Sequence, residues 1–243
     1  MSASLLTLDA RPESIQSYAR LGGILALITL FAGSFGEGYA PSVLIVSGNA
    51  AATAANFLEH EMLFRWGFMG YLVEAICDAT LTMVFWVLVR PVHANLAMLM
   101  VVFRILATCG FATAQVLYHG AFATARSAHQ LVGLDPAQLQ ALSFSFVKMS
   151  SFGGQLFTTF YGLATLVFAH LLWRSRLLPR WLSVLLAIMG SAFVLRTILM
   201  ILAPAYASPL LLASAAFGMV PLTFWLLVKG VDVSRWSAFA VRR

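Results

Sequence analysis

Residues 66–89 read WGFMGYLVEAICDATLTMVFWVLV, an apolar stretch in which only Glu74 and Asp78 carry ionisable carboxyl groups. A helix of this length is about 36 Å long, which is enough to cross the roughly 30 Å hydrocarbon core of a bilayer. A charge near the bilayer centre costs several kcal/mol or more, so such residues usually face a bundle interior or a wet cavity. The stretch therefore predicts a transmembrane helix with two polar groups directed away from lipid.

The rest of the chain has the same character. Of 243 residues, 61% are apolar and 10% are charged, and the mean hydropathy is +0.89. A soluble domain would carry about a quarter charged residues. Spans are predicted at residues 20–40, 66–89, 95–118, 152–173, 181–203 and 207–228. Because short links join them, we expect an all-α membrane bundle of six transmembrane helices that forms a single domain over residues 1–243.

Basic residues divide unequally between the two sides of this bundle. Segments on the side of the termini carry ten of them: Arg11, Arg20, Arg90, Arg174, Arg176, Arg180, Lys229, Arg235, Arg242 and Arg243. Segments on the other side carry only Arg65 and Arg126. Since cytoplasmic loops collect Lys and Arg, both termini are predicted to be cytoplasmic. The net charge of +6 reflects this asymmetry and does not indicate nucleic-acid binding.

The N-terminal segment resembles a secretory signal only superficially. The sequence Gly36-Glu37-Gly38-Tyr39 is a poor cleavage site, and the apolar run blends into a full span. We therefore expect an uncleaved first helix.

Two segments on the outer side predict additional helical structure. Asn49 precedes the Ala-rich run 50–57, so residues 49–62 are expected to form a short amphipathic helix on the outer surface. Asp135-Pro136 is an N-cap followed by proline at the first helical position. From there to Trp173 a continuous helix would be about 55 Å long. It therefore either projects outward or breaks near residues 150–154.

Six ionisable residues lie within or beside apolar stretches: Glu37, Glu74, Asp78, Arg104, Lys148 and Arg196. The helical rise from Arg90 back to Asp78, and from His93 on to Arg104, places both residues about 16–18 Å from the inner boundary. They lie on adjacent antiparallel helices. We expect them to form a buried ion pair that fixes this hairpin, or that serves as a gate or anchor for a ligand.

A second polar layer is expected nearer the outside. The same calculation of helical rise gives about 24–26 Å from the inner boundary for Glu37, Glu74 and Arg196. These three are candidate ligand-binding residues. Glu74 and Asp78 share one helix face, which connects the two layers. Lys148 counts to about 39 Å and belongs at the outer interface, where it either snorkels to headgroups or reaches inward to the ligand site. Further candidates on the outer face are Arg65, Tyr118 and His119.

No pattern for a cofactor, a metal or a catalytic set is present. The five histidines lie at segment ends without regular helical spacing, which argues against haem: His60, His93, His119, His129 and His170. Glu59-His60-Glu61 lacks the second histidine of a zinc protease motif. Cys77 and Cys109 lack metal-ligand spacing and are interpreted as small buried residues.

Several motifs together resemble a bacterial family of multi-pass membrane proteins known only as a domain of unknown function, over roughly residues 18–205. They are Ala19-Arg20-Leu21-Gly22-Gly23, the run 48–56 (GNAAATAAN), the run 63–68 (LFRWGF), the run 88–97 (LVRPVHANLA) with Phe103-Arg104, Phe160-Tyr161-Gly162-Leu163, and the run 174–180 (RSRLLPR). The resemblance implies a helical bundle in the bacterial inner membrane and no activity.

Three classes of function remain open. The first is the binding or transport of a small polar or amphiphilic ligand through an outward-facing site. The second is a structural, sensory or assembly subunit whose buried charges are helix-packing ion pairs. The third is an intramembrane enzyme with Glu74 or Glu37 as acid or base, for which no nucleophile or metal set is recognised. Membrane lipids are the expected surroundings, and the oligomeric state is open.

Overall fold

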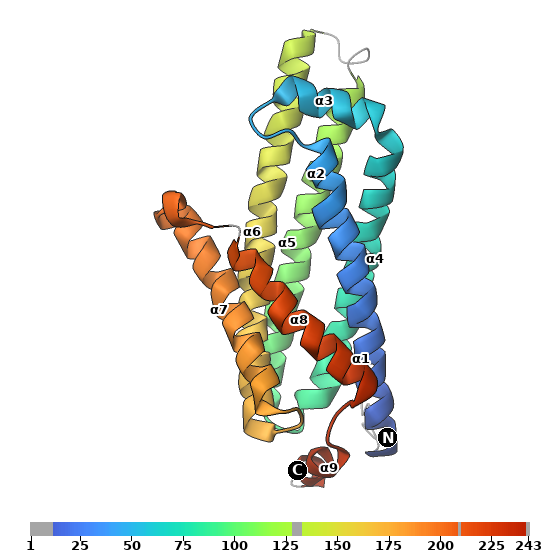
Figure 1. The fold of residues 1–243 in the computed structure, drawn as a ribbon, viewed down its shortest axis with the longest axis vertical. Helices are drawn as coiled ribbons and strands as arrows, with labels where there is room; N and C mark the ends of the chain where they lie inside the picture. The colour runs from blue at the N-terminus through green and yellow to red at the C-terminus, as the bar shows by residue number, and fades with distance from the viewer. Residues whose placement is uncertain (1–11, 128–132, 209, 242–243) are drawn as a thin grey trace, which may run out of the picture.

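The computed structural model describes residues 12–127, 133–208 and 210–241, and these residues form helices joined by short links (Figure 1). No strand occurs among them, which confirms the all-α prediction. Four residues used in the charge and histidine arguments lie outside the described residues: Arg11, His129, Arg242 and Arg243.

Six helical segments in the described part are long and apolar enough to cross a membrane, and their number and order confirm the prediction. They are Ser14–Leu44, Glu61–Val89, Ala94–Arg126, Pro136–Ser175, Arg180–Leu202 and Leu210–Val228. The first is composite and consists of α1 (Pro12–Gly33), η1 (Ser34–Tyr39) and α2 (Ala40–Leu44). The others are α4, α5, α6, α7 and α8. The chain is therefore a multi-pass membrane protein.

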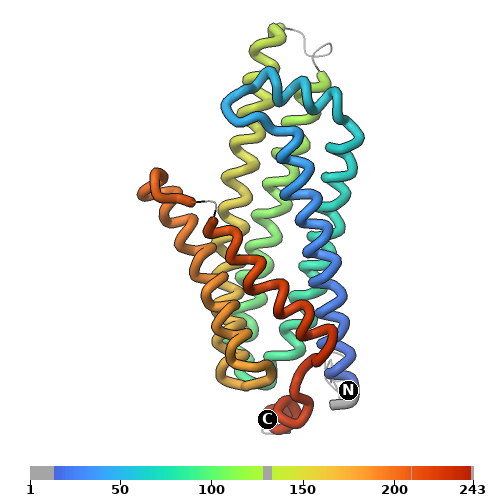
Figure 2. The backbone as a smooth tube through the Cα atoms, viewed as in Figure 1, coloured from blue at the N-terminus to red at the C-terminus, as the bar shows by residue number. Residues whose placement is uncertain are grey.

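The six spans form a closed ring. Each packs against the next in chain order, from α1 on α4 to α7 on α8, and α8 returns to pack against α1 (Figure 2). Both described chain ends lie at one end of the ring, called here the terminal end, and α3 (Ala50–Glu59) lies at the opposite end (Figure 1). The link between α7 and α8 lies lower along the long axis than the far ends of α5 and α6. A ring of this kind encloses a space that every span can line.

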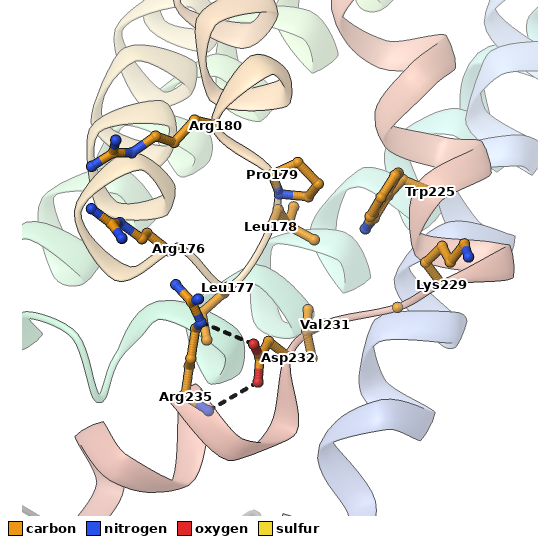
Figure 3. A pocket seen from close by; sticks show the side chains of 11 residues that line it. Arg176, Leu177, Leu178, Pro179, Arg180, Trp225, Lys229, Val231, Asp232 and Arg235 are labelled. Atoms are coloured by element: carbon orange, nitrogen blue, oxygen red, sulfur yellow. Dashed lines mark hydrogen bonds and ion pairs between the residues drawn. The ribbon is translucent and has the colours of Figure 1, made fainter.

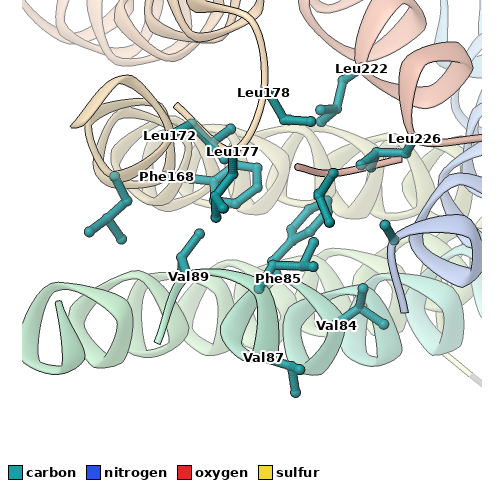
Figure 4. Close-up of a cluster of buried hydrophobic side chains, with 14 of the residues drawn as sticks. Val84, Phe85, Val87, Val89, Phe168, Leu172, Leu177, Leu178, Leu222 and Leu226 are labelled. Carbon is teal, nitrogen blue, oxygen red and sulfur yellow. The ribbon is translucent and has the colours of Figure 1, made fainter. Parts of the chain in front are cut away.

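At the terminal end the ring is filled by apolar side chains (Figure 4). Phe85 of α4 stacks on Phe168 of α6 with ring centroids 4.5 Å apart. On the α6–α7 side, the backbones are in contact, because a Cβ added to Gly162 would lie 2.8 Å from the carbonyl oxygen of Gly190. Membrane helices commonly associate by close approach through small residues, because the hydrophobic effect provides little driving force for association inside lipid.

The α3 end is covered by the predicted surface helix. Asn49 caps α3 by accepting a hydrogen bond from the backbone N–H of Ala52 at 3.0 Å. Thr53, Ala54 and Phe57 are buried, and α3 packs across α5 and α6. The helix ends at Glu59, short of the predicted residue 62, and α4 begins at Glu61. The predicted surface helix, α3, therefore packs across one end of the bundle.

The long fourth span is one helix of 40 residues, so it projects beyond the ring and the alternative of a break near residues 150–154 is wrong. A reciprocal capping box between Asp135 and Gln138 starts it. At the other end of the chain, η3 (Pro204–Tyr206) lies between α7 and α8, and α9 (Val233–Val241) is a short helix that the sequence analysis did not predict.

Candidate functional site

The first span contains a π-helical turn that carries Glu37. Over residues 34–39 the helix widens, and the N–H of Ala40 donates to the carbonyl of Phe35, five residues back. Pro41 follows and has no N–H to continue the ordinary ladder. On the side facing α4, a Cβ added to Gly36 would lie 3.0 Å from the carbonyl oxygen of Gly67. Single π turns are frequent at functional sites, and this one places Glu37 on the wall of a cavity.

That cavity, called here the inner lobe, has a volume of about 450 Å³ and lies inside the ring. All six spans contribute to its wall, from α1 and η1 round to α8. Its lining is largely apolar, with the aromatic residues Phe111, Phe157, Tyr161 and Phe193. Its ionisable carboxyl groups are Glu37, Glu74 and Asp78. The inner lobe is thus an apolar chamber with three acidic groups.

Glu74 points across the chamber toward the first span. A Cβ added to Gly33 would lie 3.0 Å from both carboxyl oxygens of Glu74, so the absence of a side chain at Gly33 makes room for this group. The Oε2 atom of Glu74 is buried and has no hydrogen-bond partner among the described residues. The same holds for the hydroxyl of Thr29, which also lines the inner lobe. Buried polar atoms without a partner are rare and call for an explanation.

Asp78, in contrast, is fully partnered. The structure brings it together with Arg104 of α5 in the ion pair that the helical rise predicted. Arg104 is 4% exposed, and its Nε donates to the hydroxyl of Thr82 at 2.8 Å. Its guanidinium carbon also lies 4.9 Å from the ring centroid of Tyr161. This pair joins α4 to α5 and α6 at the floor of the inner lobe.

A second cavity, called here the outer lobe, has a volume of about 290 Å³ and adjoins the inner lobe. The two share Glu37, Phe111, Phe157 and Leu212 in their walls. The outer lobe is more polar, with Tyr71, Gln115, Tyr118, Ser150, Ser151, Gln155, Thr158 and Arg196 in its lining. Tyr118 is 5% exposed and its hydroxyl has no partner in the described ranges, nor has Oε1 of Gln115. Glu37 therefore lies between an apolar chamber and a polar vestibule.

The predicted outer layer is divided by this arrangement. Arg196 lines the outer lobe with Glu37 but does not line the inner lobe, and it forms no ion pair within residues 12–127, 133–208 and 210–241. Lys148 is exposed on α6, lies over the ring of Phe144 at 5.3 Å and lines neither lobe. Depth placed Arg196 level with Glu37 and Glu74, but it reaches only the lobe that contains Glu37, whereas Lys148 lies outside both lobes, as expected for a residue of the outer interface.

The other outer-face candidates have different environments. Arg65 pairs with Glu61, which also contacts Arg126 at 3.2 Å. His119 is exposed at the edge of an aromatic cluster and lines neither lobe. Of the three, only Tyr118 belongs to the site.

Several lining residues were not predicted: Thr29, Tyr71, Gln115 and Tyr161. Gln115 offered a signal, because an amide inside an apolar span needs a partner. The hydroxyls of Thr29, Tyr71 and Tyr161 offered none, since these residue types also occur on lipid-facing surfaces and at interfaces. No group of three His, Cys, Asp or Glu side chains suited to a metal occurs in the part of the chain that the structure describes.

The terminal end carries a separate, basic groove of about 490 Å³ between the α6–α7 link and the α8–α9 link (Figure 3). Arg176, Arg180, Lys229 and Arg235 line it together with Asp232. Asp232 accepts hydrogen bonds from the hydroxyl of Ser234 at 2.6 Å and from the N–H of Arg235 at 3.1 Å, and these bonds lower the pKa of its carboxyl group. This groove lies at the level of the basic links and is distinct from the two lobes.

Comparison with known proteins places the chain in a family. The DUF4386 domain, described as a domain of unknown function, matches residues 21–230. The chain belongs to the DUF4386 family. Its matched region contains the whole of both lobes and the ion pair of Asp78 with Arg104. The family assignment thus confirms the expected resemblance to a domain of unknown function.

One curated relative also matches. It is an uncharacterized protein of Archaeoglobus fulgidus that is 27% identical over 169 residues, which cover 70% of this chain and 86% of that protein. No solved structure matches the chain.

Proposed function

We propose that this protein binds a small amphiphilic molecule in the inner lobe and exchanges it through the outer lobe, as a ligand-binding or transport protein of the membrane. The observation that carries the proposal is a chamber of about 450 Å³ lined by all six spans and containing unpartnered polar atoms of Glu74 and Thr29. Chambers of roughly 300–1,000 Å³ with apolar walls and a few polar groups are typical of small-molecule sites.

The two lobes suit an amphiphile better than a polar solute. The apolar and aromatic wall of the inner lobe favours an apolar body, whereas the hydroxyl and amide groups of the outer lobe favour a polar end or water. A purely structural subunit would need neither a chamber nor unpartnered polar atoms. The ion pair of Asp78 with Arg104 serves in this proposal as a rigid floor that anchors α4, α5 and α6.

The proposed orientation follows the basic residues. The described basic residues at the terminal end include Arg90, Arg174, Arg176, Arg180 and Lys229, so this end is assigned to the cytoplasm and the outer lobe to the opposite side. We propose the bacterial inner membrane as the location and one domain as the organisation. A thiol-reactive reagent that cannot cross the membrane should label Ala238→Cys only after cells are opened. Labelling of Ala238→Cys in intact cells would show that the terminal end faces outward, and the assigned orientation would then be wrong.

Occupancy of the inner lobe is tested with a cavity-filling variant and a matched control. Ala75 of α4 lines the inner lobe, whereas Ala79, one turn further along the same helix, is exposed. Ala75→Phe should therefore block the chamber, and Ala79→Phe should leave it open. Native mass spectrometry and extraction of protein purified from membranes should find a small molecule bound to the unchanged protein and to Ala79→Phe.

The Ala75→Phe variant should have lost that molecule while keeping its helical circular dichroism. If extraction and native mass spectrometry find no bound molecule, and no amphiphile in a screen binds the unchanged protein more tightly than Ala75→Phe, the proposed function is wrong.

A further inference from the structure

The charges of the inner lobe do not balance. Among the described residues its wall contains Glu37, Glu74 and Asp78 and no basic residue, and of these three only Asp78 has a cationic partner there, Arg104. Neither Glu37 nor Glu74 forms an ion pair within the described ranges, and the carboxyl group of Glu74 lies against Gly33, which precedes Glu37 by about one turn on the first span. The chamber therefore contains two carboxyl groups without protein cations.

Two ionised carboxylates without counterions are costly inside a membrane, so either protons or a bound cation must compensate them. Both carboxyl groups are placed so that they can bind a cation in the chamber. Glu74 is accommodated by Gly33 with a buried oxygen that no donor in the described part of the chain reaches, and Glu37 is placed on the wall by the π-helical turn. A group meant only to join helices would be directed at a partner, as Asp78 is directed at Arg104.

The wall of the inner lobe decides between a metal ion and an organic cation. A bare metal ion requires several oxygen ligands at short distances, and the chamber is instead large and mostly apolar. Phe111, Phe157 and Tyr161 present aromatic rings to the same space. Aromatic faces attract ammonium groups, most strongly where water is excluded. Carboxylates combined with aromatic walls are therefore suited to an ammonium group on an apolar body.

The outer lobe provides an independent indication of a ligand. Tyr118 is buried, its hydroxyl has no partner among described residues, and it lines a vestibule that shares Glu37 with the inner lobe. Arg196, which also lines this vestibule, would repel a cation that stopped there, whereas Glu37 and Glu74 would attract it further in. The charge gradient thus directs a cation to the inner lobe.

We propose that the ligand of the inner lobe is a monovalent organic cation, an amine or quaternary ammonium on an apolar or aromatic body, with its charged group between Glu37 and Glu74. This inference rests on the proposed function and adds the chemical class of the ligand.

The test compares three probes that share the phenylbutyl group as apolar body: 4-phenylbutylamine, 4-phenylbutanol and 5-phenylpentanoate. Binding is measured by scintillation proximity with the purified full-length protein in nanodiscs of zwitterionic lipid, so that lipid charge does not concentrate the amine. The Ala75→Phe variant and empty nanodiscs supply the background. The amine is expected to bind at least about tenfold more tightly than the alcohol, because its ammonium group would pair with carboxylates away from water.

Glu37→Gln and Glu74→Gln should each reduce that preference by about tenfold while binding of the alcohol changes little. Glu59→Gln is the matched control, since Glu59 is exposed at the end of α3 and lines neither lobe. Two glutamate variants are used so that one failure to fold does not remove the test.

Equal or tighter binding of the alcohol or the carboxylate, blocked by Ala75→Phe, would overturn the cationic class and leave the proposed function standing. A preference for the amine that survives both glutamine variants would overturn the assigned site. If none of the probes binds above the Ala75→Phe background, the cationic class is overturned as well, and the extraction experiment decides the proposed function separately.

Discussion

Removing one partner of the buried pair formed by Asp78 and Arg104 should destabilise the protein strongly. Arg104 is 4% exposed, pairs with Asp78, donates to Thr82 at 2.8 Å and lies 4.9 Å from the ring centroid of Tyr161. Arg104→Gln would leave Asp78 as an uncompensated buried carboxylate, and Asp78→Asn would leave an uncompensated guanidinium. Breaking a buried pair in this way typically costs about 3–5 kcal/mol.

For a chain of this size that cost corresponds to a fall in the melting temperature of roughly 6–20 °C. The assay is thermal unfolding of the purified protein in detergent, followed by tryptophan fluorescence. Arg65→Gln is the control, because Arg65 belongs to an exposed pair that contributes about 0–1 kcal/mol.

The double variant Asp78→Asn/Arg104→Gln separates loss of the pair from loss of packing. It should be more stable than the sum of the two single changes predicts, with a coupling energy of about 0.5–3 kcal/mol. The reasoning is refuted if either single variant unfolds within experimental error of Arg65→Gln, or if the two changes are simply additive.

Three further predictions concern the lobes, the ring and the basic groove. Gly33→Ala should weaken amine binding about fivefold or more, because the added Cβ would lie 3.0 Å from the Glu74 carboxyl oxygens and displace them; unchanged affinity in the nanodisc assay would contradict this. Gly162→Ala should cost about 1–3 kcal/mol in thermal unfolding, because its Cβ would meet a backbone oxygen of α7 at 2.8 Å, whereas Gly154→Ala, with open space around it, should cost far less. The lowered pKa of Asp232 means that its bonds to the start of α9 are present above the ordinary aspartate range and are lost as the pH falls through the lowered pKa. A fluorotryptophan NMR signal of Trp236, assigned with Trp236→Phe, should shift on acidification in the unchanged protein and much less in Asp232→Ala.

Helical rise predicted a side-chain contact correctly where the two helices are neighbours in sequence. Arg90 and His93 lie at the two ends of a tight link, so positions equally far from it on α4 and α5 lie at the same height, and Asp78 met Arg104. For Glu37, Glu74 and Arg196 the same calculation gave height alone. The rotation of α7 about its own axis then directed Arg196 to the outer lobe, away from Glu74.

Local sequence signals were reliable where they act over one turn. Asn49 and Asp135 both cap helices as expected, because a cap needs only its own side chain and the next three backbone N–H groups. The two glycines and the serines near residue 150 suggested a break in α6, but packing against α5 on one side and α7 on the other keeps the helix continuous. Tertiary contacts outweighed a weak local propensity there.

The sequence by itself determined that this is a membrane bundle of six helices with carboxyl groups inside it, because bilayer thickness and the cost of buried charge act on composition and spacing alone. The sequence also predicted the pairing of Asp78, but only the tertiary structure decided that Glu37 and Glu74 lack a cation and share one chamber among the described residues. Asp78 has Arg104, whereas Glu37 and Glu74 face a chamber closed by the return of α8 to α1. Closure of the ring and the rotation of each helix depend on contacts between distant spans, which the periodicity of one span does not contain.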